Sequence, residues 1–353
     1  MRGICDYARR NRWLLNLLPW RDKGSTAAAW TGHGIIACLE SAPELAEGMR
    51  ASGLPLVNVA NRSFDGVVTI APDQPAAGRM AADYFLQRGY RHLALACSDA
   101  SPCNHSSMMA FRDAVAASGR MFHLITIAGG ALDRAPFPMA VLAGSDADAV
   151  TLQNIALAAG VSIPEQLAIL GPGDEPFWAD LAPVPLSQID ADYQQLGHQA
   201  AAALESLMAG RGSDGTSAVV QPKCVITRRS SDCVAIPHRE AAAAVTFIWA
   251  HFRESITPAH VAGEVGLTRQ RLDAVLKMHL GRTLAGEIEH KRMEMAMSLL
   301  RQGQDKVRVI ARLCGFSNSL SLNRAFRRTL GAAPQQWRQQ HPHRQDRAPA
   351  VAI

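Results

Sequence analysis

The sequence predicts an α/β domain with a doubly wound parallel sheet, followed by an all-α domain with two helix-turn-helix units. In the first 240 residues, short apolar runs alternate with stretches that are apolar at helical spacing. Such alternation favours a parallel sheet that is covered by helices on both faces. From Ala241 to Gln340 the pattern is helical throughout, and one turn motif occurs twice.

Six apolar runs in the first part are predicted as buried strands, and four helical patterns lie between or after them, most of them ending at Gly. The strands are expected at Gly34–Leu39, Leu54–Val59, His92–Cys97, His123–Ala128, Ala140–Gly144 and Leu167–Gly171. The helices are expected at Gln74–Arg88, Ser106–Gly119, Ala147–Gly160 and Gln194–Ala209. A further strand is expected at Ala218–Thr227. Ligands of such folds bind beyond the carboxyl ends of the strands, so the loops there are candidate sites.

The helical part begins with a predicted helix-turn-helix unit. Thr257 can cap a helix whose first turn accepts Pro258, because proline needs no hydrogen-bond acceptor there. Gly266 permits a tight turn, and Thr268 can cap a second helix that runs to about His279. Ala262, four residues before the glycine, is small enough to let the two helices approach closely.

The same arrangement recurs 49 residues later. Ala311 lies four residues before Gly315, Phe316 is expected in the core, and Ser317 is expected to cap the next helix. Between the units, Leu284–Leu300 is predicted as one long helix. A rigid connecting helix can hold two recognition helices in successive major-groove segments, about 34 Å apart.

Charge supports this division of the chain. Residues from Ala241 onward hold 17 Lys and Arg against 8 Asp and Glu, whereas the first 240 residues hold 19 against 23. A basic module beside an acidic domain is typical of proteins that bind a polyanion. A solvated basic face explains the same surplus, so charge alone leaves both interpretations open.

The residues expected to touch DNA follow from the geometry of a recognition helix, whose early exposed positions reach base edges. Arg suits guanine, and Asn or Gln suits adenine. The later arginines are expected to contact phosphates, which position a protein without reading sequence. The expected contacts are Thr268, Arg269, Gln270 and Arg271 in the first unit, and Ser317, Asn318, Ser319, Asn323, Arg324 and Arg327 in the second.

The remaining composition limits the alternatives. Seven scattered cysteines without CxxC spacing indicate reduced thiols, and neither a zinc site nor any other cofactor is expected. No apolar run approaches the roughly 20 residues of a membrane helix, so we expect a cytoplasmic protein. The sequence contains no P-loop, GxSxG or HExxH motif, and we therefore expect no enzymatic activity.

Four segments of the helical part resemble the AraC/XylS family of transcription regulators. They are Gly266-Leu-Thr-Arg-Gln-Arg-Leu, Lys291-Arg-Met-Glu-Met-Ala-Met-Ser-Leu-Leu, Ile310-Ala-Arg-Leu-Cys-Gly-Phe-Ser and Ala325-Phe-Arg-Arg-Thr-Leu-Gly-Ala-Ala-Pro-Gln-Gln-Trp-Arg. The resemblance covers about Ala241–Gln340. Departures from the family pattern are Ser321 and Leu322 in place of an aromatic pair, and Leu276 in place of a common Phe.

The first part resembles the periplasmic-binding-protein-like sensors of LacI-type regulators, on residues 76–94 and 163–171. Joined to an AraC-type module, it looks like the subgroup of xylose operon activators. The resemblance implies a DNA-binding regulator, most simply an activator, with a small sugar effector such as D-xylose, a homodimer, and contact with double-stranded DNA and RNA polymerase. It also implies Asp146 and Asp174 as sugar-binding residues, because carboxylates accept paired hydrogen bonds from vicinal hydroxyls. Asp146 is equally suited to cap the following helix, and Asp73 is expected to cap the helix from Pro75.

Other features depart from such a sensor, and we expect its domain to be truncated at the N-terminus. Ser107 stands where the family often has Arg, Pro172-Gly173 partly replaces a usual Asp or Asn, and Gly129–Pro138 is too short for a helix. A DNA-binding protein with a degenerate, ligand-independent sensor is therefore the alternative. The expected domains are a ligand-sensing domain over 1–228, a linker over 229–240, a DNA-binding domain over 241–340 and a disordered tail over 341–353.

Overall fold

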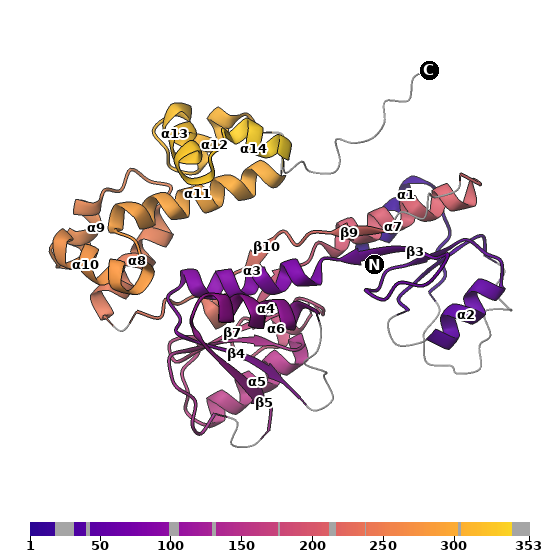
Figure 1. Cartoon of the computed structure of the whole chain (residues 1–353), viewed down its shortest axis with the longest axis horizontal. Helices are drawn as coiled ribbons and strands as arrows, with labels where there is room; N and C mark the ends of the chain where they lie inside the picture. The colour runs from indigo at the N-terminus through magenta and orange to yellow at the C-terminus, as the bar shows by residue number, and fades with distance from the viewer. Residues whose placement is uncertain are drawn as a thin grey trace.

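The computed structural model describes residues 1–17, 32–39, 43–98, 106–128, 132–175, 177–211, 217–236, 238–302 and 305–340. The predicted tail over 341–353 lies outside these residues. Figure 1 shows two lobes that contain sheets and a separate group of helices formed by the C-terminal part of the chain.

The first lobe is built on a parallel four-stranded sheet. Its strand order is β1-β2-β3-β9, with β1 at Ile35–Ala37, β2 at Leu56–Asn58, β3 at Val68–Pro72 and β9 at Ala218–Val220. Helices α1 (Arg2–Arg10), α2 (Pro43–Ala51) and α7 (Tyr193–Met208) belong to this lobe. Val57, Ile70 and Leu196 are buried together in its core, so the apolar face of α7 covers the sheet.

The second lobe holds a six-stranded sheet in the order β10-β8-β7-β6-β4-β5. Its strands are β4 (His92–Cys97), β5 (Met121–Thr126), β6 (Met139–Ala143), β7 (Leu167–Gly171), β8 (Ser187–Asp190) and β10 (Cys224–Ile226). All pairings are parallel except that of β10 with β8. The helices are α3 (Gln74–Gln87), α4 (Ser106–Ala117), α5 (Asp146–Ala158) and α6 (Trp178–Leu181). Two separate apolar clusters, one on either face, make this the doubly wound sheet that the sequence predicts.

The six predicted strands are all present, but one prediction is wrong. Residues Ala218–Thr227 form two strands, β9 and β10, which belong to different sheets. The chain crosses from one lobe to the other between them, at Gln221-Pro222-Lys223. Proline cannot donate to a sheet ladder, and it interrupts the run at the crossing. The described residues between β5 and β6, 127–128 and 132–138, contain no helix, as the short segment predicts.

The C-terminal part is helical, as the sequence predicts. A short 3-10 turn, η2 (Arg229–Ser231), leads to α8 (Arg239–His251), α9 (Pro258–Glu264), α10 (Arg269–Leu280), α11 (Leu284–Gln302), α12 (Val307–Leu313), α13 (Ser319–Leu330) and α14 (Pro334–Gln340). Two apolar cores divide these helices. One lies around α8, α9, α10 and the start of α11, and the other lies around the end of α11, α12, α13 and Trp337.

The connecting segment is packed against the second lobe. Ser230 is fully buried, and its hydroxyl donates to the carbonyl oxygen of Ile169 at 2.7 Å and accepts from the backbone N–H of Ser187 at 2.8 Å. Val234 and Ile236 are buried in the first helical core. The link between the α/β domain and the helices is therefore held on both sides.

The cysteines differ from expectation at one position. Cys97, at the end of β4, is disulfide-bonded, which contradicts the prediction of reduced thiols there. Cys5, Cys224, Cys233 and Cys314 are free. The described part of the chain holds no cluster of side chains suited to a metal ion, and no helix within it is long and apolar enough to cross a membrane.

Candidate DNA interface and ligand cleft

The first helix-turn-helix unit consists of α9, a turn at Gly266 and α10. Both predicted caps are present: the Thr257 hydroxyl accepts the N–H of His260 at 3.2 Å, and the Thr268 hydroxyl accepts the N–H of Arg271 at 3.4 Å. Gly266 has a φ of +67°, the left-handed region that glycine occupies without strain.

The first turn of α10 presents its polar side chains to solvent. Thr268, Arg269, Gln270 and Arg271 are all exposed, while Leu272 and Leu276 of the same helix are buried against α9. Arg269, whose side chain is 59% exposed, lies 3.4 Å from the partly buried Asp273 carboxylate, and a pair with one exposed partner contributes little. The guanidinium is therefore available to an external partner.

The second unit consists of α12, a turn at Gly315 and α13, and here the predicted cap is wrong. Asn318, not Ser317, is the N-cap of α13, and its side-chain oxygen accepts the N–H of Ser321 at 2.9 Å. Ser317 instead shares a hydrogen bond with the hydroxyl of Ser321 at 2.9 Å. Asn and Ser are both good capping residues, and Asn318 occupies the N-cap position, one residue after the predicted Ser317.

The expected contact residues of the second unit are placed unequally. Ser317, Asn318, Arg324 and Arg327 are exposed, and Ser319 is partly buried. Asn323 is also partly buried, and its side-chain oxygen is enclosed with no hydrogen-bond partner in the part of the chain that the structure describes. The exposed side chains therefore form a second basic and polar surface on α13.

The two units are fixed to each other through the turn of the second. A Cβ atom at Gly315 would lie 2.4 Å from the carbonyl oxygen of Phe252, in the connection between α8 and α9. The same carbonyl accepts a hydrogen bond of 2.8 Å from Arg292 of α11, which also donates to the carbonyl of Glu254 at 2.8 Å. The two units are therefore packed against each other as one rigid body.

A cleft of about 500 Å³ lies between the two lobes of the α/β domain. Its polar lining comes mainly from the starts of α3, α4, α5 and α7 and from the loop after β7. These residues are Asn61, Arg62, Asp73, Gln74, Ser106, Ser107, Ser145, Asp174 and Tyr193. The position matches the expectation that ligands bind beyond the carboxyl ends of the strands.

Of the two expected ligand residues, Asp174 lines the cleft and Asp146 does not. Asp146 is fully buried, and its carboxylate accepts hydrogen bonds from the N–H groups of Gly173 (3.1 Å) and Glu175 (3.0 Å) and from the Gln188 amide (2.8 Å). Asp146 therefore holds the wall of the cleft in place. It is not the helix cap either, because Ser145 caps α5, whereas Asp73 caps α3 as predicted.

Other lining residues were not identified from the sequence. Tyr193 begins α7, Gln74 begins α3, and Arg62 lies after β2, with its guanidinium 5.4 Å from the ring centre of Phe64. Ser107, where the resemblance leads one to expect Arg, does line the cleft. These residues lie in segments that follow the end of a strand, and that position was the signal that could have identified them. Gln74 and Tyr193 were missed because the strands before them, β3 and β8, were not predicted.

The buried carboxylate of Asp146 gives the domain a pH dependence. Burial, followed by the nearby Asp174 carboxylate, raises the pKa of Asp146 to about 7, against the backbone N–H groups of Glu175 and Gly173. The folded protein thus retains a proton that the unfolded chain releases at lower pH. The free energy of unfolding therefore falls as pH rises toward 7, by up to about 1.4 kcal/mol per pH unit from this group.

We expect Asp146→Asn to remove this dependence. Urea unfolding at pH 5, 6, 7 and 8 should show wild type losing stability relative to the variant as pH rises. Asp133→Asn, at an exposed position of the same lobe, serves as the control and should follow wild type. Parallel curves for wild type and Asp146→Asn would contradict the assignment.

Comparisons with known proteins follow the two parts of the chain. Residues 82–231 match the model of a periplasmic binding protein-like domain, and residues 261–340 match that of a helix-turn-helix domain. The xylose operon regulatory protein of Escherichia coli (strain K12) is 24% identical over 331 residues, 88% of this chain and 84% of the relative. That of Haemophilus influenzae is 23% identical over 203 residues, 58% of this chain and 52% of the relative.

Solved structures show the same architecture. The structure of the xylose-binding transcription activator XylR covers 96% of this chain and 93% of its own, with a TM-score of 0.58 and 23% identity. A complex of the transcriptional regulator CelR with cellobiose covers 65% of this chain and 77% of its own, with a TM-score of 0.56 and 20% identity. The chain therefore joins a periplasmic binding protein-like domain to a C-terminal helix-turn-helix domain, and it is similar over most of its length to xylose operon regulatory proteins.

Proposed function

We propose that this protein is a sequence-specific transcription regulator that binds DNA through α10 and α13 and responds to a sugar in the cleft between its lobes. The observation that carries the proposal is the joined pair of helix-turn-helix units. The first unit exposes Arg269 and Gln270 at the start of α10, and the second exposes Asn318 at the N-cap of α13 and Arg324 in the middle of that helix. These groups form hydrogen bonds with base edges in the major groove.

The cleft supports the sugar response. Its volume of about 500 Å³ lies within the range of small-molecule sites, and serine, glutamine, asparagine, tyrosine and carboxylate groups line it. Hydroxyl-rich ligands need such mixed donors and acceptors, and Asp174 supplies a charged acceptor. The regulators that match over most of this chain are named for xylose, so D-xylose is the effector that we propose to test first.

Footprinting tests the function directly. A DNA duplex selected from random sequences by the wild-type protein is footprinted alone and with D-xylose, D-ribose or cellobiose. A sugar-dependent change in protection supports the regulator. A footprint that none of the sugars changes supports the alternative, a ligand-independent DNA-binding protein with a degenerate sensor.

Arg269 is expected to read one base pair. Arg269→Ala should lower affinity for the selected duplex by about 1–3 kcal/mol and relax preference at a single position, as the loss of a bidentate contact to guanine does. Fluorescence anisotropy with a series of singly substituted duplexes measures the effect. Arg112→Ala, at an exposed position on α4 of the second lobe, serves as the control and should bind like wild type. An equal loss on every duplex would instead make Arg269 a phosphate contact.

Assembly and location are part of the same proposal. We place the protein in the cytoplasm as a homodimer that activates transcription through RNA polymerase, on the strength of the family resemblance. Two copies would supply four helix-turn-helix units to one operator. Sedimentation of the protein with and without the selected duplex tests the dimer, and an exclusively monomeric complex would contradict it.

A further inference from the structure

The end of α3 is a place where the α/β domain meets the helical domain. α3 starts at the cleft, where Asp73, Gln74 and Ala77 contribute to the lining. The helix is fourteen residues long and ends at Gln87, with Arg88 as its C-cap. In Figure 1 the helix runs from the side of β3 toward α8 of the helical domain. A helix of this length spans about 21 Å as a rigid element.

Arg88 is held between aromatic rings from the two domains. Its guanidinium carbon lies 3.4 Å from the ring centre of Tyr84, one turn earlier in α3, and 4.6 Å from the ring of Trp249 in α8. Only 3% of Arg88 is exposed. A desolvated guanidinium over an indole face is a favourable cation–π arrangement, and its planar group stacks where an ammonium cannot.

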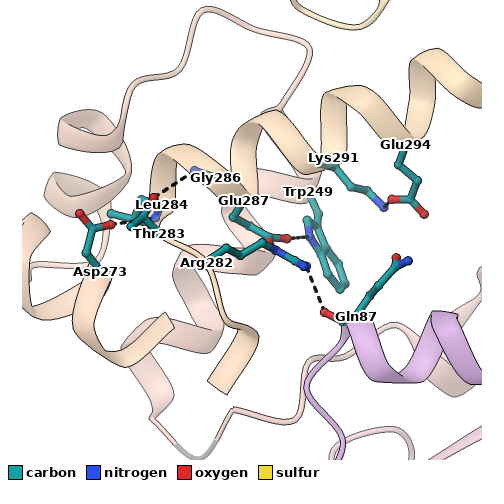
Figure 2. A network of polar contacts seen from close by, with 10 residues as sticks. All are labelled: Gln87, Trp249, Asp273, Arg282, Thr283, Leu284, Gly286, Glu287, Lys291 and Glu294. Atoms are coloured by element: carbon teal, nitrogen blue, oxygen red, sulfur yellow. Dashed lines mark hydrogen bonds and ion pairs between the residues drawn. The ribbon is translucent and has the colours of Figure 1, made fainter. Parts of the chain in front are cut away.

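A series of polar contacts connects the Trp249 ring of this stack to the end of α3. The Trp249 indole N–H donates to Glu287 at 2.8 Å, and Glu287 also pairs with Arg282. Arg282 in turn donates to the carbonyl oxygen of Gln87 at 3.2 Å. Figure 2 shows Trp249, Glu287 and Arg282 directed toward the end of α3 at Gln87. The circuit thus fixes the Trp249 ring relative to the last residue of α3.

The same end of α3 lies against the recognition helix of the first unit. A Cβ atom at Gly89 would lie 3.0 Å from the Leu280 side chain and 3.7 Å from the carbonyl oxygen of His279, in the last turn of α10. Arg282 follows Gly281, the C-cap of α10. A shift at the end of α3 therefore acts on α10 through packed atoms on one side and through Arg282 on the other.

The segment that joins the two domains is tied to α3 at the same point. The Tyr84 hydroxyl shares hydrogen bonds with the hydroxyls of Ser231 (2.8 Å) and Thr227 (3.1 Å). The carbonyl of Arg88 accepts the N–H of Ala235 at 2.9 Å. The connecting segment therefore moves with α3, and the Arg88 stack is one of its contacts with the helical domain.

We propose that the stack of Tyr84, Arg88 and Trp249 couples the cleft to α10, with α3 as the rigid link between them. The inference rests on the proposed function and adds the path by which the sugar signal reaches the DNA-binding helices. Closure of the lobes on a ligand moves the start of α3, and Arg88 transmits that movement to α8 and α10. Coupling requires an element that both sites bias. α3 contributes to the cleft at one end and packs against the first unit at the other.

The experiment measures the coupling factor, the Kd for DNA without D-xylose divided by the Kd with saturating D-xylose. The protein is the full chain, and the DNA is the duplex selected by the wild type. Coupled binding sites usually change each other's affinity by about 5–150-fold. Wild type is expected in this range, whereas Arg88→Lys and Trp249→Leu should fall below about twofold. Lysine keeps the charge without the planar stack, and leucine removes the ring.

Two further measurements separate coupling from folding and binding. Calorimetry should give the variants a Kd for D-xylose within about threefold of wild type. The substitutions remove the coupling between the two sites and leave the sugar site itself unchanged. Arg79→Lys, at an exposed position of α3 itself, is the matched control and should keep the full coupling factor. If Trp249→Leu does not fold, Arg88→Lys decides the matter, because circular dichroism can verify its fold.

The outcomes distinguish the two proposals. Loss of coupling in Arg88→Lys, with D-xylose binding retained, supports the route. A wild-type coupling factor that persists in the folded variants overturns the route and leaves the regulator intact. A wild-type protein whose DNA affinity does not respond to D-xylose overturns the xylose response and the route with it.

Discussion

Gly315→Ala is expected to destabilise the second helix-turn-helix unit strongly and to separate it from the first. Gly315 has a φ of +78°, where an L side chain costs about 1–2 kcal/mol. The added Cβ would also lie 2.4 Å from the Phe252 carbonyl oxygen. That carbonyl is held by Arg292 at 2.8 Å, so the clash is relieved only by moving the two units apart. We expect a loss above about 3 kcal/mol, the size typical of strain added to lost packing.

Gly266→Ala is the matched control, because Gly266 occupies the same place in the first unit. Its φ is +67°, but a Cβ there would meet nothing within 4 Å. Alanine should therefore cost only the backbone strain, about 1–2 kcal/mol. The difference between the variants in urea unfolding, followed by circular dichroism, measures the docking of the units.

Footprinting adds a functional measure of the same change. Wild type should protect two successive major-groove segments, about one helical turn apart. Gly315→Ala should lose protection of the segment that α13 contacts, while Gly266→Ala keeps both. Equal destabilisation by the two variants, or an unchanged footprint of Gly315→Ala, would contradict the docking of the units through this turn.

The helix-turn-helix units could be predicted from the sequence because their signals are local. Caps at Thr257 and Thr268 and turns at Gly266 and Gly315 depend on residues a few positions apart, and the structure confirms all four. The cap at Ser317 was predicted wrongly because two good capping residues, Ser317 and Asn318, are adjacent there. Asn318 is the cap, because its side-chain oxygen accepts the N–H of Ser321.

The errors in the α/β domain come from contacts that the sequence does not contain. Asp146 looks like a ligand residue from its loop, but Gln188, 42 positions away, helps to enclose its carboxylate. The run from Ala218 to Thr227 contains Pro222, which marks a break in the strand, but only the assembled lobes show that its two halves join different sheets as β9 and β10. No sequence motif marks Arg88 as important, because its contact with Trp249 forms only through tertiary packing. Local patterns predict elements, whereas burial and partnership depend on the assembled fold.

Glu287→Ala is expected to be the other strongly destabilising change. Glu287 of α11 is completely buried, and it accepts the Trp249 indole N–H at 2.8 Å and pairs with Arg282, whose side chain is 22% exposed. Removing the carboxylate leaves the Trp249 indole N–H without a partner and the largely enclosed Arg282 guanidinium without its counter-ion, with the Gln87 carbonyl oxygen as its remaining acceptor. Breaking one side of a buried pair costs about 3–5 kcal/mol, because the remaining charge stays desolvated.

Glu264→Ala on α9 provides the control for this change. Its carboxylate lies 3.4 Å from the His260 ring, and both side chains are about half exposed. Exposed pairs contribute about 0–1 kcal/mol, so this variant should unfold almost as wild type does. Glu287→Gln should lie between the two, because the amide oxygen still accepts from Trp249 while the charge that holds Arg282 is gone. If Glu287→Ala were no more destabilised than Glu264→Ala, the circuit in Figure 2 would contribute no more than a surface pair. The position of Trp249 would then depend on the contacts of its ring, including the Arg88 stack, rather than on the hydrogen bond to Glu287.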